Sequence, residues 1–363
     1  MNLDRIATSV YRVPTDRPEA DGTIAWDATT MVLAEVVADD GTAGTGWSYT
    51  SPAAAAVVQE VLAPAVAAGP LEDVRRAWSA MVAAVRNIGR PGIASTAISA
   101  VDVALWDLKA RSRGVALFDL LGAARRSVPI YGSGGFTSYS LDQLVKQLVG
   151  WVAQGIPRVK MKIGTDWGTR LDLDRSRIMA VRQAIGPGPE LFIDANGAYT
   201  AKQAIALASD LGSAASYFEE PVSSDQLAEL ALIRRSIPQD VAAGEYGYDP
   251  WYFHAMIRAG SVDIVQADAT RCLGVTGFLM AADLAYGAGL RFSAHTSPTI
   301  HAHAACAAPQ LSHVEYFHDH VRLENMFFDG VLQPEGGGLV PAADRPGLGV
   351  VLKRDDAERY RVS

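Results

Sequence analysis

The chain has 363 residues and a formal net charge of −8, and these values together with its composition exclude several classes of protein. Apolar residues make up 49% and charged residues 20%, which is typical of a chain with a large folded core and not of a disordered one. The acidic balance and the lack of any run of Lys and Arg argue against nucleic-acid binding.

The sequence contains no segment that predicts secretion or membrane insertion. Residues 1–6 enter a polar–apolar alternation at once, and no stretch approaches the roughly twenty apolar residues of a membrane span. The two cysteines, Cys272 and Cys306, form no CxxC motif and are interpreted as reduced structural thiols. We therefore expect a cytoplasmic protein without a membrane partner.

Residues 1–125 predict an α+β capping domain. Two apolar strands and a hairpin turn at 38–44 precede a run of helices, an order that is typical of this class. The predicted strands are Leu3–Val13 and Thr30–Val37, and the predicted helices are Pro52–Ala67, Leu71–Arg86 and Ala94–Arg113.

Residues 14–29 predict a long loop between these two strands. Loops of this size in a compact domain are usually functional, and we expect this one to act as a lid that sets substrate choice. It contains Arg17, a candidate partner for the second carboxylate of a diacid sugar, and Trp26, a candidate shield against water. A solvated Arg17 and a Trp26 packed between domains are equally good interpretations of each residue alone.

Residues 126–325 alternate apolar strands with amphipathic helices, which predicts an α/β barrel with its active site at the carboxyl ends of the strands. No eighth helix is evident, so the predicted fold is a (β/α)7β-type TIM barrel, and residues 326–363, rich in Gly and Pro, return to the capping domain. The eight predicted strands are Val128–Tyr131, Arg158–Ile163, Leu191–Asp194, Tyr217–Glu219, Val241–Gly244, Ile264–Gln266, Leu290–Ala294 and His313–Tyr316.

Three carboxylates, Asp194, Glu219 and Glu245, follow three successive strands at intervals of about 25 residues. This interval accommodates one strand, one helix and two loops, so the three groups are expected to converge at the barrel mouth. Converging carboxylates remain ionised in a cleft only if a cation holds them, and oxygen ligands favour a hard ion such as Mg²⁺. The sequence therefore predicts a metal site.

The remaining strand ends also carry ionisable residues. Lys160 and Lys162 alternate along one strand and point to the same side of it. His295 ends the strand after the one that Asp268 follows, and a carboxylate that accepts the Nδ1 proton of a histidine leaves Nε2 as a general base. Singly, a Lys-x-Lys or a strand-end histidine is more often structural. One coherent site at seven strand ends, including that of Glu315, favours catalysis.

Other histidines and glycines are interpreted as structural. His301 and His303 lie two residues apart on a predicted helix and face different directions, which argues against a shared metal. Gly336–Gly338 lacks the strand-to-helix setting of a phosphate loop. His313, His318 and His320 surround the eighth strand, where solvated histidines are the default, with His318 as the one that approaches the site.

In order along the chain, the motifs resemble the mandelate racemase subgroup of the enolase superfamily. The resemblance covers nearly the whole chain, and each motif is weak alone but the ordered set is specific. An aspartate at 268 followed by His295 separates this subgroup from relatives that place a lysine base there. The motifs are 97–111, Lys-Met-Lys-Ile-Gly at 160–164, Asp-Ala-Asn-Gly-Ala-Tyr at 194–199, Glu-Glu-Pro at 219–221, Gly-Glu at 244–245, Gly-Val-Thr-Gly at 274–277, Ser-Ala-His at 293–295 and Val-Glu-Tyr at 314–316.

The resemblance implies a role for each residue of the site. Asp194, Glu219 and Glu245 would bind Mg²⁺, and Lys162 would be one base while His295 with Asp268 would be the other. Lys160 would neutralise an enolate oxygen, and Glu315, as the carboxylate or as the protonated acid, would hydrogen-bond the substrate carboxylate. Asn196 is a further candidate for substrate binding, Glu220 is expected to face outward or lie behind the ligands, and the role of Arg271 stays open. A homo-oligomer, a dimer or octamer, is also implied.

Two enzymatic reactions fit these residues. The leading hypothesis is an acid-sugar dehydratase, in which a β-hydroxyl leaves as water after an enolate forms. The alternative is a racemase or epimerase of a 2-hydroxy acid that uses the same two bases, and a remote one is a non-catalytic metal-binding barrel. Exchange of the substrate α-hydrogen in D₂O and formation of a 2-keto product would discriminate the three.

Overall fold

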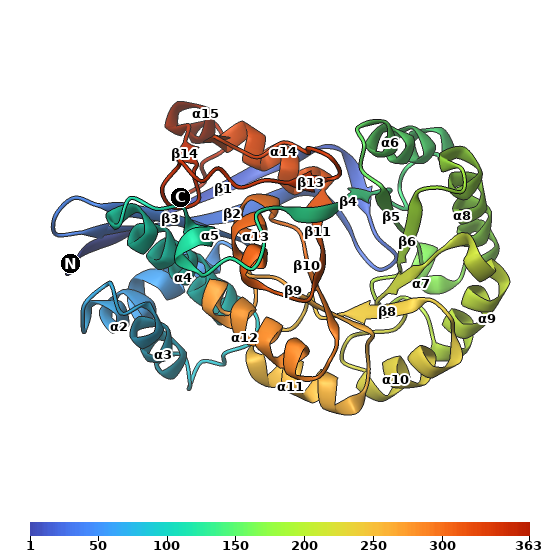
Figure 1. The fold of residues 1–363 in the computed structure, drawn as a ribbon, viewed down its shortest axis with the longest axis horizontal. Coiled ribbons are helices and arrows are strands. Elements are labelled where there is room, and N and C mark those ends of the chain that lie inside the picture. The colour runs from blue at the N-terminus through green and yellow to red at the C-terminus, as the bar shows by residue number, and fades with distance from the viewer.

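The computed structural model describes all residues from 1 to 363, and its centre is a closed barrel of eight parallel strands (Figure 1). Each strand pairs with the next along the chain, and the eighth pairs with the first, which confirms the predicted strand order. The strands are β4 (Val128–Gly134), β5 (Arg158–Lys162), β6 (Glu190–Asp194), β7 (Tyr217–Glu219), β8 (Asp240–Ala243), β9 (Ile264–Ala267), β10 (Arg291–Ala294) and β11 (Leu311–Phe317).

Helices connect successive strands and cover the outside of the barrel. Local capping explains several starts: Ser140 and Gln143 form a reciprocal capping box at one helix, and Thr200 and Gln203 do so at another. The helices are α6 (Leu141–Ala153), α7 (Thr165–Gly168), α8 (Leu171–Ile185), α9 (Ala201–Leu211), α10 (Leu227–Ser236), α11 (Pro250–Ala259), α12 (Gly274–Gly287) and α13 (Pro298–Ala304). An additional helix, α14 (His318–Phe327), follows the eighth strand directly, where the sequence pattern did not predict one.

The capping domain joins a three-stranded antiparallel sheet to helices. Strands β1 (Leu3–Ala20), β2 (Ala25–Ala38) and β3 (Ala43–Tyr49) form the sheet in chain order. Helix α4 (Ile93–Ser112) is buried on nearly all sides because it contacts both this sheet and α12 of the barrel. The remaining helical segments are α1 (Ala53–Val57), the π-helix Val58–Leu62, α2 (Ala63–Ala67), α3 (Val74–Ala84) and α5 (Leu117–Leu120).

The last residues of the chain lie against the capping domain. After short strands β12 (Phe328–Asp329), β13 (Gly338–Leu339) and β14 (Val351–Leu352), helix α15 (Arg354–Glu358) leads to the carboxyl terminus. There Val10 N–H donates to the Ser363 carbonyl at 2.8 Å, and Arg12 N–H donates to the Tyr360 carbonyl at 2.9 Å. The exact domain boundaries stay predictions.

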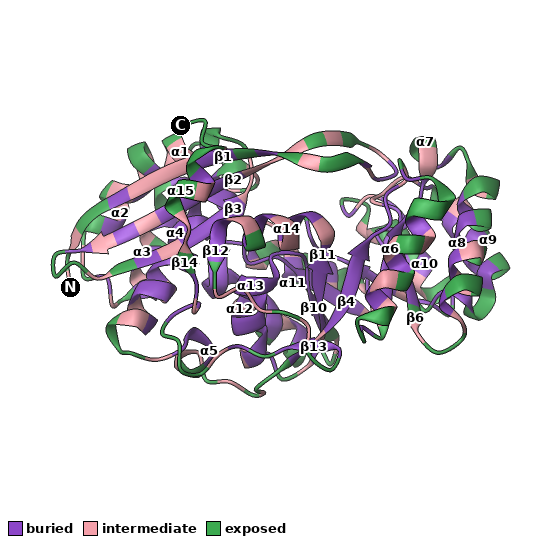
Figure 2. Ribbon diagram, turned by 90° about the horizontal axis from the view of Figure 1, so that it is seen from above, coloured by how far each residue is buried: buried purple, intermediate pink, exposed green.

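The prediction of a loop at 14–29 is wrong, because β1 and β2 extend through this segment up to a short turn. Pro14 still faces Ala28, and after a register shift Glu19 faces Trp26, so only Asp21–Ile24 turns. Figure 2 shows this hairpin arm (residues 14–29) as a long ribbon that reaches from the capping domain across the barrel. Its tip is fixed to barrel loops: Thr137 N–H donates to the Ala20 carbonyl, and Trp167 N–H donates to the Gly22 carbonyl.

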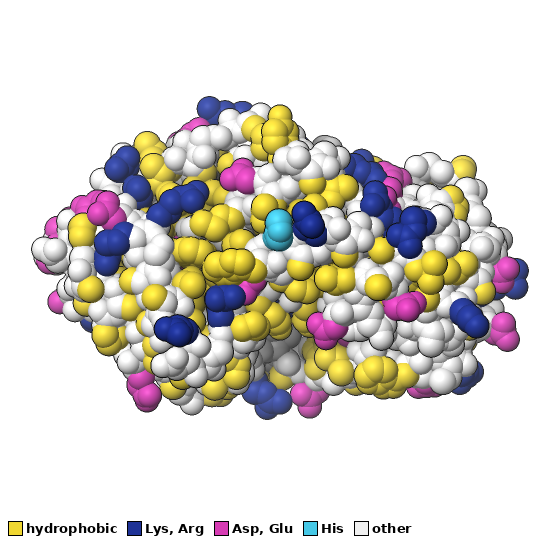
Figure 3. All heavy atoms as spheres, turned by 90° about the horizontal axis from the view of Figure 1, so that it is seen from below, with side chains coloured by type: hydrophobic (Ala, Val, Ile, Leu, Met, Phe, Trp, Pro, Cys, Tyr) yellow, Lys and Arg dark blue, Asp and Glu magenta, His cyan; other side chains and the backbone are white.

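Two further observations concern the surface. None of the helices combines the length and the apolar character that crossing a membrane requires. On the face drawn in Figure 3, Lys and Arg side chains are interspersed with Asp and Glu side chains and do not gather into a basic patch.

Candidate active site

Asp194, Glu219 and Glu245 meet at the carboxyl ends of β6, β7 and β8, as the spacing predicted. Asp194 and Glu219 face each other across the β6–β7 register, and Glu245 follows the next strand. One oxygen of each carboxylate lies within 4.8 Å of the others, and all three side chains are buried. Only closure of the parallel barrel brings together residues that are so far apart in the chain.

The charges around this cluster do not balance. Six buried carboxylates lie at the strand ends, whereas the cations among them are Lys160, Lys162 and the partly buried Arg271. Glu219 Oε2 and Glu245 Oε2 have no hydrogen-bond partner in the protein. Because burying unpaired anions is costly, six ionised carboxylates would need a further cation, and these free oxygens fit a divalent cation held by three carboxylates.

Lys160 and Lys162 point into the barrel from β5, as their alternation predicted. Lys160 Nζ lies 2.7 Å from Glu219 Oε1, 2.8 Å from Glu315 Oε1 and 3.1 Å from Asp194 Oδ2. Lys162 Nζ lies 2.5 Å from Asp194 Oδ2 alone. Lys160 is therefore locked in a network, whereas Lys162 has one partner and lines the open cavity.

Burial lowers the pKa of both lysines, but the facing carboxylates more than offset it. The net pKa of Lys160 is raised well above its usual value, chiefly by Glu219 and Glu315, and that of Lys162 is raised by Asp194. The carboxylates that face both lysines thus favour their protonated form. To act as a base, Lys162 must first lose its proton. That requires a change in the negative charge of the carboxylates beside it.

His295 and Asp268 form the pair that the sequence predicted. His295 Nδ1 donates to Asp268 Oδ2 at 2.8 Å, and the N–H and hydroxyl of Thr270 donate to the other oxygen. Burial raises the pKa of Asp268, but the hydrogen bond and charge of His295, together with His301 and Arg271, outweigh it, and the net pKa is lowered. The ionised Asp268 holds the Nδ1–H tautomer, which leaves His295 Nε2 as an acceptor toward the cavity.

Glu315 ends β11 and is held by three donors. The Ser133 hydroxyl lies 2.6 Å from Oε1, Lys160 lies 2.8 Å from it, and the Thr296 N–H lies 3.0 Å from Oε2. Burial raises the pKa of Glu315, but Lys160 outweighs it and the net pKa is lowered. These three donors favour the ionised form of Glu315, one of the two forms that the sequence left open.

Arg271 joins the metal-ligand cluster to the histidine pair. Its Nη1 lies 3.3 Å from Glu245 Oε1, and its Nε lies 3.7 Å from Asp268 Oδ2. Its guanidinium also lies over the ring of Tyr246, 5.3 Å from the ring centroid. The sequence left this residue without a role, and its contacts now assign it to positioning two carboxylates.

A cavity of about 280 Å³ opens above these groups, between the barrel and the capping domain. Trp26 and Asn196, both predicted to bind substrate, line this cavity together with Lys162 and His295. The other lining residues include Asp21, Ile24, Ala28, Thr29, Thr30, Tyr49, Thr50, Glu245, Tyr246, Arg271, Thr296, Glu315, Phe317 and His320.

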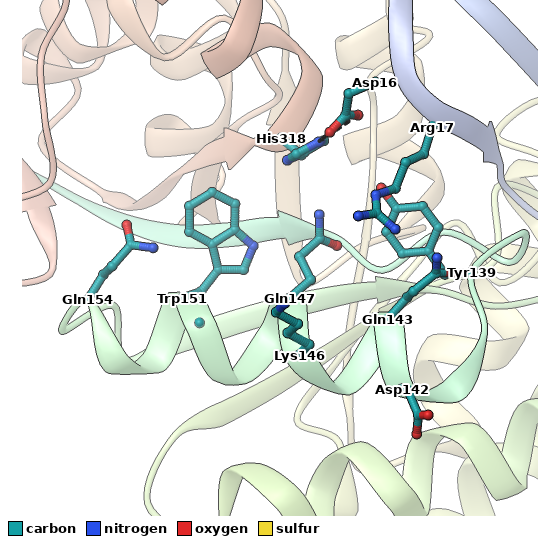
Figure 4. A pocket seen from close by; sticks show the side chains of 11 residues that line it. Asp16, Arg17, Tyr139, Asp142, Gln143, Lys146, Gln147, Trp151, Gln154 and His318 are labelled. Carbon is teal, nitrogen blue, oxygen red and sulfur yellow. Dashed lines mark hydrogen bonds and ion pairs between the residues drawn. The ribbon is translucent and has the colours of Figure 1, made fainter.

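Arg17 does not reach this cavity. It lines a separate cavity beside α6, with Asp16, Tyr139, Trp151 and His318, as Figure 4 shows. Arg17 lies in the stretch between Pro14 and Glu19 where the pairing of β1 with β2 shifts register, and it is exposed, whereas Glu19 is buried. Arg17 was predicted to pair with the distal carboxylate of a substrate, which requires a place in the active-site cavity. It lies outside that cavity.

The other histidines differ from their expected placement. His301 and His303 are buried and structural, as predicted, and His301 accepts the Ala269 N–H at Nε2. His313 and His320, expected to be solvated, are buried. His320 lines the cavity, whereas His318, the expected neighbour of the site, pairs with Asp16 at 3.1 Å outside it.

Glu220 is not outward-facing. It is 1% exposed, its Oε1 has no hydrogen-bond partner, and its backbone has a positive φ of 38°. Burial, and then the charges of Glu245 and Asp194, raise its pKa well above the usual value. Glu220 therefore lies behind the metal-ligand cluster, which is the other position that the sequence allowed.

Glu19 in the hairpin arm gives a pH-dependent prediction. Burial, followed by the charge of Asp319, raises the pKa of Glu19 to about 8, against the opposing hydrogen bond from Trp26. The folded protein thus holds a proton that the unfolded chain releases near pH 4.5, so Glu19 destabilises the fold progressively as the pH rises from about 4.5 to 8. Glu19→Gln is expected to raise the melting temperature at pH 8.5 by a few degrees and to leave it unchanged at pH 4.

Differential scanning fluorimetry of both proteins across this pH range measures the difference. Glu60→Gln, at an exposed position, is the matched control and is expected to show no pH-dependent gain. An equal gain in melting temperature for Glu19→Gln and Glu60→Gln would contradict the assignment of the pH dependence to Glu19.

Comparison with known proteins assigns both parts of the chain to known families. Residues 143–357 match the model of enolase C-terminal domain-like proteins, and residues 5–122 match the mandelate racemase/muconate lactonizing enzyme N-terminal domain. The chain is 33% identical to a D-galactarolactone cycloisomerase of Agrobacterium fabrum, with 100% of this chain and 99% of the relative covered.

Two solved structures show how far the likeness extends. A mandelate racemase/muconate lactonizing enzyme-like protein from Rubrobacter xylanophilus superposes with a TM-score of 0.96 at 47% identity, and each chain is covered completely. The second structure is the L-talarate/galactarate dehydratase of Salmonella typhimurium LT2, liganded with Mg and L-lyxarohydroxamate. It superposes with a TM-score of 0.91 at 28% identity, with 99% of this chain and 93% of that chain covered. Homologous structures thus bind Mg and a sugar-acid ligand, and the buried triad fits a metal site.

Proposed function

The chain belongs to the mandelate racemase/muconate lactonizing enzyme family of the enolase superfamily, and from this premise we propose that it is a sugar-acid dehydratase. The proposal is that it removes the α-proton of a sugar acid and then eliminates water from the β-carbon. One observation carries it: a lysine and a carboxylate-oriented histidine face the same cavity from β5 and β10, beside three metal-ligating carboxylates.

In this proposal Asp194, Glu219 and Glu245 hold Mg²⁺. The bound cation would supply positive charge that stabilises the enolate and weakens the hold of these carboxylates on the Lys162 proton. Lys160 would contribute positive charge near the developing negative charge without moving, because its ammonium is fixed by three carboxylates. Lys162 and His295 carry out the two proton transfers.

Lys162 and His295 then act as two proton-transfer groups on different sides of the substrate. Their strands are three positions apart around the closed barrel, so their side chains approach the cavity from different directions. Lys162 abstracts the α-proton. His295, which enters this step as the imidazolium with a proton on each ring nitrogen, delivers its Nε2 proton to the β-hydroxyl; the enolate electrons form the carbon–carbon double bond and the hydroxyl leaves as water. Asp268 stabilises the imidazolium that precedes this second transfer.

Other outcomes share the first step. If His295 returns the proton to the opposite face of the α-carbon, the product is an epimer. If the leaving group is a ring oxygen that stays attached to the product, the result is a cycloisomerisation, the reaction in the name of the Agrobacterium relative. The three outcomes differ in whether water is lost and in whether the configuration at the α-carbon is inverted.

The test is a screen of sugar acids and their lactones with Mg²⁺ in D₂O. We expect α-hydrogen exchange by NMR together with a 2-keto product that semicarbazide detects and mass spectrometry shows to have lost one water. An isomeric product of unchanged mass would overturn dehydration in favour of epimerisation or cycloisomerisation. No exchange with any acid would contradict enolate chemistry altogether.

A further inference from the structure

The capping domain provides one wall of the active-site cavity, and this wall is almost uncharged. We call it the capping wall; it comprises Asp21, Ile24, Trp26, Ala28, Thr29, Thr30, Tyr49 and Thr50. Its one charged side chain is Asp21, whose Oδ1 accepts the Thr23 N–H at 2.6 Å and the Ile24 N–H at 2.9 Å. The wall therefore contains an anion and no cation.

The wall nevertheless offers neutral hydrogen-bonding groups. The Tyr49 hydroxyl is buried and has no partner in the protein. Beside it lies His320, whose ring stacks on Tyr49 with centroids 3.5 Å apart. The Ser297 N–H donates to His320 Nδ1, so that nitrogen carries no proton, and the neutral ring has its N–H at Nε2. Tyr49 and His320 are suited to the hydroxyl groups of a substrate.

The cations of the cavity all lie on the barrel side and have partners. Lys162 contacts Asp194, and Arg271 contacts Glu245 and Asp268. Arg17 lies in the other cavity. No guanidinium or ammonium group of the chain is free to receive a second carboxylate at the capping wall.

We propose that the substrate carries a single carboxylate, at its reacting end, and an uncharged polyhydroxyl tail that contacts the capping wall. The substrate class is thus the monocarboxylic sugar acids and not the diacids. A second carboxylate would lose its water next to Asp21 without gaining a cation, and such uncompensated burial of charge selects against the diacid. This inference rests on the proposed function, because it assigns the tail of the substrate in the same site.

The test uses pairs of acids that differ only at the terminal carbon, such as galactonate with galactarate and gluconate with glucarate. With the Mg²⁺-loaded protein, the preferred monoacid is expected to exceed its diacid at least about tenfold in kcat/KM, or in affinity by calorimetry. Equal or better performance of the diacids would overturn the inference. Because calorimetry does not depend on turnover, it decides between mono- and diacid even if the proposed dehydration fails.

A variant of the capping wall provides the second measurement. Ile24 is 60% exposed at the tip of the hairpin arm and lines the cavity, so the fold tolerates a long polar side chain there. Ile24→Arg supplies the missing cation and is expected to shift the diacid-to-monoacid ratio of affinities about fivefold toward the diacid. Ile24→Gln, of similar polarity but no charge, is the matched control. Equal shifts of the diacid-to-monoacid ratio in Ile24→Arg and Ile24→Gln would show that the charge of the capping wall does not select between the two kinds of acid.

Discussion

Replacing Glu219 with glutamine is expected to lower kcat by about 10³-fold or more and to weaken Mg²⁺ binding, while the fold stays intact. The loss in rate follows because charge stabilisation by a bound cation is worth several kcal/mol in such a reaction. The fold should not suffer, because burial and the charge of Asp194 already raise the pKa of Glu219 well above its usual value. A neutral side chain at this position relieves repulsion among the buried carboxylates.

Three measurements check this expectation: kcat, Mg²⁺ affinity by calorimetry, and thermal unfolding followed by circular dichroism. Glu229→Gln, which makes the same chemical change at an exposed position of α10, should match the unaltered protein in all three. Excess EDTA should abolish turnover of the unaltered protein reversibly. Full activity in EDTA would refute a catalytic metal.

Lys162→Ala and His295→Asn are each expected to lower turnover by about 10²–10⁴-fold, the usual contribution of general acid–base catalysis. The two variants should differ in what they retain. With His295→Asn, Lys162 can still remove and return the α-proton of one substrate configuration, so exchange with D₂O continues without loss of water. With Lys162→Ala, that exchange should cease.

Proton NMR in D₂O measures exchange and product formation in the same sample. Lys202→Ala and His254→Asn, both at exposed positions, are the matched controls and should retain normal exchange and turnover. The double variant Lys162→Ala/His295→Asn should be inactive. Normal turnover by this double variant would exclude the two-base arrangement.

Much of the barrel and its site was predictable because it depends on local patterns. A short apolar strand followed by a polar side chain is visible within a few residues, as at Asp194 and Glu219, and the interval between strands implies the topology. Once parallel strands close into a barrel, their carboxyl ends must share one face, so residues such as Lys162 and His295 converge there. The sequence by itself therefore determined the barrel and the set of residues at its mouth.

Only the tertiary structure decided which residues shape the rest of the cavity. The proline-containing segment 14–29 reads locally as a loop, yet pairing between β1 and β2 extends it into an arm. Arg17 lies in a separate cavity, and Trp26 lines the active one. Helix α14, directly after the last barrel strand, buries His320 against Tyr49.

The physical reason is that these outcomes depend on partners far away in the chain. The cavity that Arg17 lines is formed by the surface of α6, and the proton position on His320 is set by the Ser297 N–H. Neither partner leaves a periodic signal near the residue that it controls. The chemistry at the strand ends is thus encoded locally, whereas the selectivity of the capping wall arises only from the packing of two domains.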